Sequence, residues 1–280
     1  MVLAALLSAL LFVMVLAFLV REAAPALYTP GLGALLSNAG WFPSAGSYGL
    51  LPMLLATLAT TAGAILFAAP LGIGAAVFSN FFAPRWLAAI FRRMVELLAG
   101  IPSVVFGLWG LLVLVPVIAQ FLGGPGQSLL AAILVLTLMI VPTVALSADA
   151  ALRAVAPELL FSAYSLGFSR SAVVRRVVLP AAARGIRSGI FLGLSRGVGE
   201  TMAIVMVAGN KVQAPYDLLL PVRTLSANIA LELGYADTNH RATLFAGGLL
   251  LMVLIVVTLT LAHGFPSGRA NAHQAGDRAR

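Results

Sequence analysis

Long runs of apolar residues, separated by polar links, divide the chain into six segments. A run of about 18 or more apolar residues is typical of a helix that crosses a membrane. The runs predict spans at residues 2–20, about 49–78, about 97–122, 128–148, 188–208 and 242–263. The sequence therefore predicts an all-α polytopic membrane protein with six transmembrane helices.

Two of these spans, the second and the third, are longer than the roughly 20 residues that a bilayer requires, so we expect tilt or kinks. Proline removes a helical hydrogen bond and crowds the preceding turn. The expected kink points are Pro70, Pro102, Pro116 and Pro142.

The composition agrees with a membrane protein. Hydrophobic residues make up 61% of the 280 positions and charged residues only 9%, whereas soluble domains carry about 25% charged residues. A net charge of +8 would suggest nucleic-acid binding in a soluble protein, but here the arginines fall between the apolar runs, where positive charge sets topology. The absence of Cys excludes disulfides and cysteine-based chemistry. Because His240, His263 and His273 show no ligand spacing, we expect no metal site and no cofactor.

The basic residues predict an orientation. If the N-terminus is cytoplasmic, four basic residues are external, namely Arg21, Lys211, Arg223 and Arg241. Twelve are cytoplasmic, namely Arg85, Arg92, Arg93, Arg153, Arg170, Arg175, Arg176, Arg184, Arg187, Arg269, Arg278 and Arg280. Because cytoplasmic loops carry the excess of Lys and Arg, we expect both termini to be cytoplasmic.

The chain reads as one transmembrane domain over residues 1–280, with a core at 49–263 and a cytoplasmic tail at 264–280. The first apolar run has an alternative reading as a signal peptide, since Ala24 and Ala26 offer small residues for cleavage. Its length exceeds the usual core of about 7–15 apolar residues and no basic residue precedes it. We therefore expect a retained span.

Two links, residues 149–187 inside and 209–241 outside, are too long to be simple turns. The inner link predicts a helix–turn–helix. Pro157 suits a first helical position, Gly167 a C-terminal cap and Ser169 the N-cap of a second helix.

Pro180 is expected to limit that second helix. The unit carries apolar side chains that must be buried against something, at Leu159, Leu160, Ala163, Leu166 and Phe168. The alternative is an ordinary amphipathic helix at the membrane interface.

Four glycines recur every fourth residue in the fifth span, at Gly185, Gly189, Gly193 and Gly197. On a helix they form one smooth ridge that lets a neighbouring backbone approach closely. The ridge predicts helix packing at the centre of a bundle and does not by itself indicate a ligand.

Arg196 and Glu200 lie beside this ridge, four residues apart and therefore on one face of a continuous helix. Each charge near the bilayer centre costs about 2.5–3.5 kcal/mol on insertion scales, so such groups pair or face a water-filled path. Arg is a permanently charged fork that suits phosphate oxygens, and a nearby Glu would hold it between substrates. The alternative is a pair that only fixes helix packing.

Two catalytic motifs are excluded. Residues 193–197 fit the G-x-S-x-G pattern of serine hydrolases, but that motif requires a strand, a sharp turn and a helix, and here it lies in an apolar helix. No G-x-x-x-x-G-K-[ST] is present, so the chain is not expected to bind ATP through a P-loop.

The inner link resembles the cytoplasmic signature of bacterial ABC-importer permeases, E-A-A-x-x-x-G followed by I-x-L-P. It stands here as Phe161-Ser162-Ala163-x-x-x-Gly167 and then Val177-x-Leu179-Pro180, with the spacing kept. Phe161 replaces the Glu of the signature and Ser162 replaces an Ala. The resemblance implies a cytoplasmic coupling helix in which Ala163, Gly167, Leu179 and Pro180 form the unit that docks on an ATPase.

Further segments resemble the PstC family of phosphate permease subunits. Residues 194–203, Leu-Ser-Arg-Gly-Val-Gly-Glu-Thr-Met-Ala, with Gly209-Asn210 after them, resemble its R-x-x-G-E-T-M-A…G-N segment. Residues 96–107 resemble another stretch, as does Trp41-Phe42-Pro43 leading to Thr57-Leu58. The resemblance covers roughly residues 30–262.

This resemblance implies a multi-pass subunit of the bacterial inner membrane that imports inorganic phosphate and hydrolyses no ATP itself. It implies three kinds of partner: a PstA-like second permease subunit, two copies of a cytoplasmic ATPase and a periplasmic phosphate-binding protein. Arg196 would contact phosphate and Glu200 would supply the counter-charge. The alternatives are a permease for another oxyanion, such as sulfate or molybdate, and a passive channel or structural membrane protein.

Overall fold

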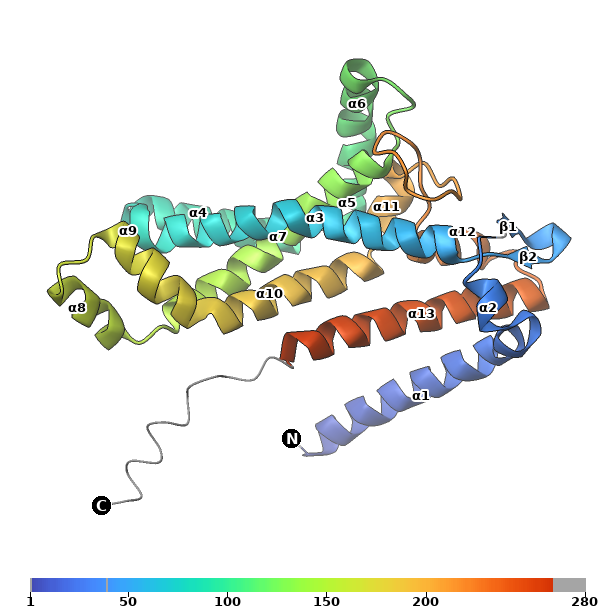
Figure 1. Ribbon diagram of the computed structural model, residues 1–280, viewed down its shortest axis with the longest axis horizontal. Coiled ribbons are helices and arrows are strands. Elements are labelled where there is room, and N and C mark those ends of the chain that lie inside the picture. The colour runs from blue at the N-terminus through green and yellow to red at the C-terminus, as the bar shows by residue number, and fades with distance from the viewer. Residues whose placement is uncertain (1, 39, 264–280) are drawn as a thin grey trace.

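The computed structural model describes residues 2–38 and 40–263, and the predicted tail at 264–280 lies outside them. The described residues form an almost entirely helical protein (Figure 1). Its first helices are α1 (Val2–Ala26), α2 (Leu32–Leu35), α3 (Leu51–Val77), α4 (Arg85–Gly100), α5 (Ser103–Trp109) and α6 (Val115–Leu122). They are followed by α7 (Leu129–Arg153), α8 (Pro157–Ser165), α9 (Arg170–Val173), α10 (Leu179–Gly199), α11 (Met202–Val207), α12 (Leu225–Glu232) and α13 (Thr238–His263). A short antiparallel hairpin of β1 (Trp41–Phe42) and β2 (Ser47–Tyr48) lies between α2 and α3.

Six helices in the described part of the chain are long and apolar enough to cross a membrane. They run over Leu3–Thr29, Leu51–Phe82, Ser103–Leu122, Leu129–Arg153, Arg170–Gly199 and Thr238–Leu261. The predicted number of spans is therefore confirmed, and the structure corrects the bounds of three of them, the first, the third and the fifth. The first extends to Thr29 and not to residue 20.

The third span begins at Ser103 and not near residue 97. Ile101 and Pro102 both adopt extended backbone conformations, which separate α4 from α5. The break at Pro102 agrees with its prediction as a kink point, because the proline ring cannot continue the preceding turn. Pro70 and Pro142 lie inside the unbroken helices α3 and α7.

The fifth span, predicted at residues 188–208, was misplaced. A continuous helix runs from Arg170 to Gly199, and Glu200 is extended. Pro180 was wrongly expected to end the second helix of the inner link: it lies in the first turn of α10, directly after a π-helical turn at Val174–Val178. The wider π-turn relieves the hydrogen-bond pattern that proline would otherwise interrupt.

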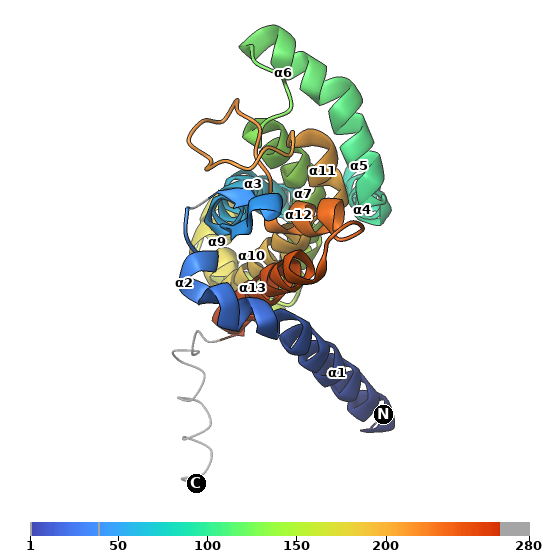
Figure 2. The same ribbon diagram turned by 90° about the vertical axis from the view of Figure 1, so that its right-hand side faces the viewer.

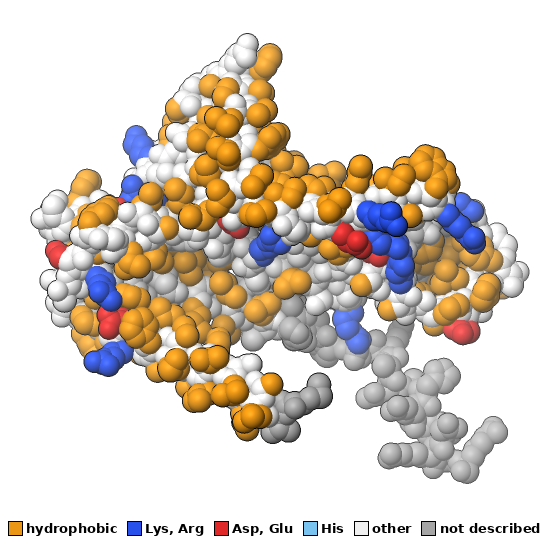
Figure 3. Space-filling model, turned by 180° about the vertical axis from the view of Figure 1, so that it is seen from behind, with side chains coloured by type: hydrophobic (Ala, Val, Ile, Leu, Met, Phe, Trp, Pro, Cys, Tyr) orange, Lys and Arg blue, Asp and Glu red, His pale blue; other side chains and the backbone are white. Residues whose placement is uncertain are grey.

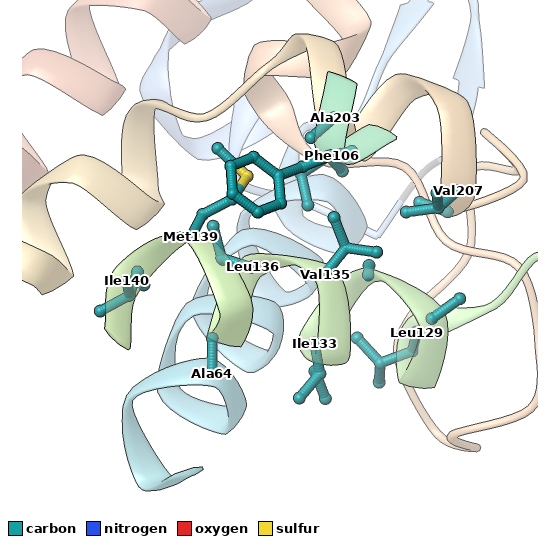
Figure 4. Close-up of a cluster of buried hydrophobic side chains, with 14 of the residues drawn as sticks. Ala64, Phe106, Leu129, Ile133, Val135, Leu136, Met139, Ile140, Ala203 and Val207 are labelled. Atoms are coloured by element: carbon teal, nitrogen blue, oxygen red, sulfur yellow. The ribbon is translucent and has the colours of Figure 1, made fainter. Parts of the chain in front are cut away.

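Helix α7 forms the centre of the bundle, with α3 and α10 packed along it (Figure 1). Leu136, Met139 and Phe106 are buried together with Ala203 and Val207 of α11 (Figure 4). Burial of an apolar side chain of this size contributes about 1.5–3 kcal/mol on transfer scales. The bundle around α7 is thus the rigid frame against which the other elements are placed.

Two helices extend away from this frame. Helix α1 packs on α13 and projects at its N-terminal end, while α6 projects on another side of the bundle (Figure 2). Hydrophobic side chains spread over much of the outer face, including α6 (Figure 3). Exposed apolar surface of this extent indicates contact with lipid or with other subunits.

At the end of the molecule that carries α8, one carboxylate holds several chain segments together. Asp149 of α7 accepts a hydrogen bond of 2.6 Å from the amide of Asn80, and forms salt bridges with Arg92 at 3.4 Å and Arg153 at 3.1 Å. Asp149 therefore connects α4, and the π-helical turn at Phe78–Phe82 that follows α3, to α7 just before the chain enters α8.

Candidate functional site

The turn after α8 has the geometry of a helix C-terminal cap. Gly167 has a φ of +79°, its N–H donates to the carbonyl of Tyr164, and the N–H of Phe168 donates to the carbonyl of Ala163. This pair of bonds is a Schellman motif, and it requires a left-handed residue that glycine adopts without steric cost. The next helix begins as predicted, because the Ser169 hydroxyl accepts a hydrogen bond from the N–H of Ala172.

Helix α8 has one buried residue, and its exposed face carries large apolar side chains. Ala163 is buried among apolar residues near the start of the long fifth helix, including Val173 and Val178. Phe161 is 70% exposed and Leu166 is 75% exposed. Phe161, where the permease signature has Glu, therefore points an aromatic ring outwards from the turn.

The four glycines of α10 all lie against neighbouring helices. A Cβ at Gly185 would meet Ala151, and one at Gly189 would lie 2.4 Å from the Cβ of Ser147. Gly193 and Gly197 approach Ile140 of α7, and Gly197 also approaches Thr61 of α3. Any larger side chain on this ridge would push α10 away from α7.

Arg196 is exposed and lies in the last turn of α10, which ends at Gly199. Within the described residues its side chain makes one hydrogen bond, from Nη1 to the hydroxyl of Thr143 on α7 at 3.3 Å. A guanidinium has five N–H donors, so several remain directed to the surface. This arrangement leaves a fixed positive charge available to an anion at an exposed face of a membrane helix.

The expected pairing of Arg196 with Glu200 on one helical face is not what the structure shows. Helix α10 ends at Gly199, so the two residues do not share a helix. No salt bridge joins them in the part of the chain that the structure describes. Oε1 of Glu200 instead accepts from the N–H of Ala203, 3.4 Å away, in the first turn of α11.

The chain turns sharply directly after α11. Gly209 and Asn210 have φ values of +81° and +53°, and the Asn210 amide donates to the carbonyl of Val205 at 2.7 Å. The Gly-Asn pair thus makes a sharp turn at the end of α11, a conformation that these two residue types adopt most readily.

Sequence reasoning missed Thr143 and Ser226 as neighbours of the site. The Ser226 hydroxyl donates to the carbonyl of Glu200 at 2.8 Å. The sequence could have pointed to Thr143 only because it is a hydroxyl residue within the apolar run 128–148. No local pattern links Ser226 to a residue 26 positions earlier.

The chain matches a protein family over most of its length. The model of the family described as "Binding-protein-dependent transport system inner membrane component" matches residues 68–266. A probable ABC transporter permease protein, YqgH of Bacillus subtilis, is 39% identical over 84% of this chain and 77% of its own length. Phosphate transport system permease proteins PstC of Xylella fastidiosa and Mesorhizobium japonicum are 36% and 37% identical, over 79% and 81% of this chain and 75% and 76% of their own.

Solved structures share the fold at lower identity. A chain of the inward-facing MetNI methionine ABC transporter has a TM-score of 0.57 and 23% identity, covering 82% of this chain and 94% of that one. A chain of a bacterial ABC transporter that imports alginate has a TM-score of 0.60 and 18% identity, covering 92% and 94%. At this identity the likeness concerns the arrangement of helices.

Proposed function

This chain belongs to the family of binding-protein-dependent transport system inner membrane components, and we propose that it is the permease subunit of an ATP-driven importer of inorganic phosphate. The observation that carries the proposal is the exposed Arg196 in a chain whose relatives include proteins named as phosphate transport permeases. The family makes the chain a multi-pass component of the inner membrane. Phosphate as the cargo, and ATP hydrolysis on a separate chain, are parts of the proposal.

Arg196 would contact phosphate in transit. A charged group within a membrane-spanning segment is costly unless it faces a polar path or a partner. The planar guanidinium presents parallel N–H groups that match two oxygens of a tetrahedral anion. The hydroxyl of Thr143 fixes one N–H and leaves the others free for the anion.

Glu200 would supply the counter-charge that prevents phosphate from staying bound. It lies in the extended link directly after α10, with one carboxylate oxygen held by the N–H of Ala203. A small change in this link would move the carboxylate relative to Arg196. We therefore propose that Arg196 and Glu200 form their pair in another step of the transport cycle, in which the conformation differs from that of the structure.

The helix that carries Arg196 also begins at the coupling unit. The fifth span runs unbroken from Arg170, next to the turn at Gly167, to Gly199. Movement of α8 would therefore reach Arg196 along one rigid element. We propose that ATP binding closes a pair of cytoplasmic ATPase subunits on α8, with Ala163, Gly167, Leu179 and Pro180 holding the unit in shape, and that this opens the path outwards.

The proposed orientation places α8 in the cytoplasm and the β1–β2 hairpin outside. The excess of Arg near α8 and α9 supports this assignment through the positive-inside rule. A periplasmic phosphate-binding protein would then deliver the anion at the hairpin end. A second, PstA-like permease subunit would complete the path on the exposed side of Arg196.

The experiment is uptake of labelled phosphate in cells that lack other phosphate importers, with the chain expressed together with the proposed second permease subunit, ATPase and binding protein. Arg196→Gln should abolish uptake while the complex still co-purifies. Arg184→Gln, on an exposed position of the same helix, is the matched control and should transport normally. Normal uptake by Arg196→Gln would contradict the role of Arg196, and competition by sulfate or molybdate stronger than by phosphate would contradict the cargo.

A further inference from the structure

A buried polar network lies near the β1–β2 hairpin, at the end of the molecule opposite to α8 (Figure 1). Its centre is Glu232, the last residue of α12, which is 6% exposed. Oε2 accepts a hydrogen bond of 2.7 Å from the indole N–H of Trp41 and lies 2.9 Å from Nε2 of His240. Oε1 accepts from the guanidinium of Arg223. The carboxylate thus joins α12 to the hairpin, to α13 and to the segment before α12.

Arg223 extends the network to the end of α11. Its Nε donates to the carbonyl of Asn210 at 2.8 Å, and its Nη1 donates to the side chain of Asn228 at 3.0 Å. The neighbouring Val222 donates its N–H to the carbonyl of Ala208 at 2.8 Å. The bonds to the carbonyls of Asn210 and Ala208 close the loop between α11 and α12 at its base, and the ion pair of Arg223 with Glu232 ties this base to the last residue of α12.

Aromatic rings enclose the His240 side of the network. The ring centroids of Trp41, Tyr48 and Tyr235 lie 5.6, 6.1 and 6.2 Å from that of His240. Burial, with the nearby charge of Asp237, raises the pKa of the Tyr48 phenol. Glu232 and its partners Trp41 and His240 are buried, and low exposure to water strengthens the interaction of the carboxylate with Arg223.

The opposite end of α12 is attached to the link that follows α10. The hydroxyl of Thr57 on α3 accepts from the N–H of Leu225 at 3.0 Å, and the hydroxyl of Ser226 donates to the carbonyl of Glu200 at 2.8 Å. Glu232 and Ser226 lie in the same eight-residue helix, so we expect a displacement at Glu232 to move Ser226 as well. The buried network and the break between α10 and α11 are therefore connected by one helix.

We propose that Glu232 is a positioning residue that, together with Arg223, fixes α12 and so sets the geometry of the α10–α11 link beside Arg196. The consequence for transport rests on the proposed function, whereas the positioning itself does not depend on the cargo. A buried ion pair adds little net stability compared with apolar residues, but removal of one partner leaves an uncompensated charge. The role of the Arg223–Glu232 ion pair is to hold α12 in its position.

The test measures how accessible the α10–α11 link is to a thiol reagent, and it needs no phosphate. The chain has no Cys, so a single Cys can be placed at Met202, the exposed first residue of α11, or as a control at Leu192, exposed on α10. Each is labelled with a small, membrane-permeant thiol reagent in the detergent-solubilised, assembled importer, because position 192 lies within a membrane-spanning helix. Adding Glu232→Gln should change the labelling rate at position 202 by at least about threefold, the population change produced by a free-energy shift of one RT, and leave position 192 unchanged.

The double variant Glu232→Gln with Arg223→Gln keeps the test decisive if the single variant fails to assemble, because it leaves no buried unpaired charge. This variant also lacks the Arg223–Glu232 ion pair, so the labelling rate at position 202 should again change. Equal rates at 202 in the variant and the parent would overturn the proposal, as would equal changes at 202 and 192, which indicate general loosening. A wild-type complex that transports no phosphate would contradict the proposed function and leave the labelling result standing.

Discussion

The guanidinium of Arg196 on α10 donates a hydrogen bond to the hydroxyl of Thr143 on α7 across a distance of 3.3 Å. This bond crosses the interface that Gly193 and Gly197 make narrow, because neither glycine has a side chain to separate the helices. A guanidinium on a long flexible stem loses side-chain entropy when it is fixed. Thr143 therefore restricts the orientation of the guanidinium that we propose to contact the anion.

Thr143→Val tests this positioning, since valine keeps the branched shape of threonine and removes the hydroxyl. A hydrogen bond to a charged group contributes about 1.5–3 kcal/mol when buried and less at an exposed site, so phosphate uptake should fall by up to about tenfold. The measurement is the initial rate of labelled-phosphate uptake at several concentrations. Thr143→Ser keeps the hydroxyl and should retain most of the activity; equal rates in the Val and Ser variants would show that the bond is not used.

Gly189→Ala tests the close approach of α10 to α7. The added Cβ would lie 2.4 Å from the Cβ of Ser147, so the helices must separate, and overpacking of this kind costs about 1–3 kcal/mol. The variant should unfold at a lower temperature in detergent, as followed by circular dichroism.

Gly74→Ala is the matched control, because a Cβ at that position of α3 meets no atom within 4 Å. Alanine also has a higher helix propensity than glycine, by about 1 kcal/mol. The control should therefore be as stable as the parent or more stable. A control that is less stable than Gly189→Ala would contradict the packing described for the ridge.

The number of spans could be predicted from the sequence because each span is a long apolar run, and hydropathy measures that property directly. The break after Gly199 could not. Helix α11, Met202–Val207, is apolar throughout, so the sequence after Glu200 reads as the second half of one span and gives no sign that the backbone changes direction. The first turns of α10 carry Arg184 and Arg187 and were read as part of the polar link, although they continue the same helix.

The local geometry of the coupling turn was predictable, whereas the contacts around the site were not. Pro157, Gly167 and Ser169 each have a strong preference for one position in a helix end, and each occupies it. Trp41 and Glu232 are 191 positions apart, and their contact depends on how α12 is placed against the hairpin. Periodicity within one element contains no information on such a contact.

Single cysteines at Ser44 and Ser171 test the orientation. Both serines are exposed, Ser44 between the hairpin strands and Ser171 in α9 at the α8 end, so small thiol reagents can reach either. In intact cells an impermeant reagent should label the Cys at position 44 and label the one at position 171 only after the membrane is opened. Labelling of both from one side would contradict a six-span arrangement, and the reverse pattern would invert the proposed orientation.

Two substitutions at Gly167 distinguish the effect of the left-handed backbone conformation from the effect of adding a side chain. The φ of +79° is strained for a β-branched residue, at a cost of about 1–2 kcal/mol, while Asn tolerates this region better than other residues with a side chain. A Cβ here would meet no atom within 4 Å, so the effect of a substitution comes from backbone conformation and not from a clash. Gly167→Val should reduce the stimulation of ATPase activity by the loaded binding protein several-fold, and Gly167→Asn should retain most of it, with equal amounts of both variants in the membrane. If Gly167→Val couples as well as the parent, the left-handed turn after α8 is not part of the transmission to Arg196.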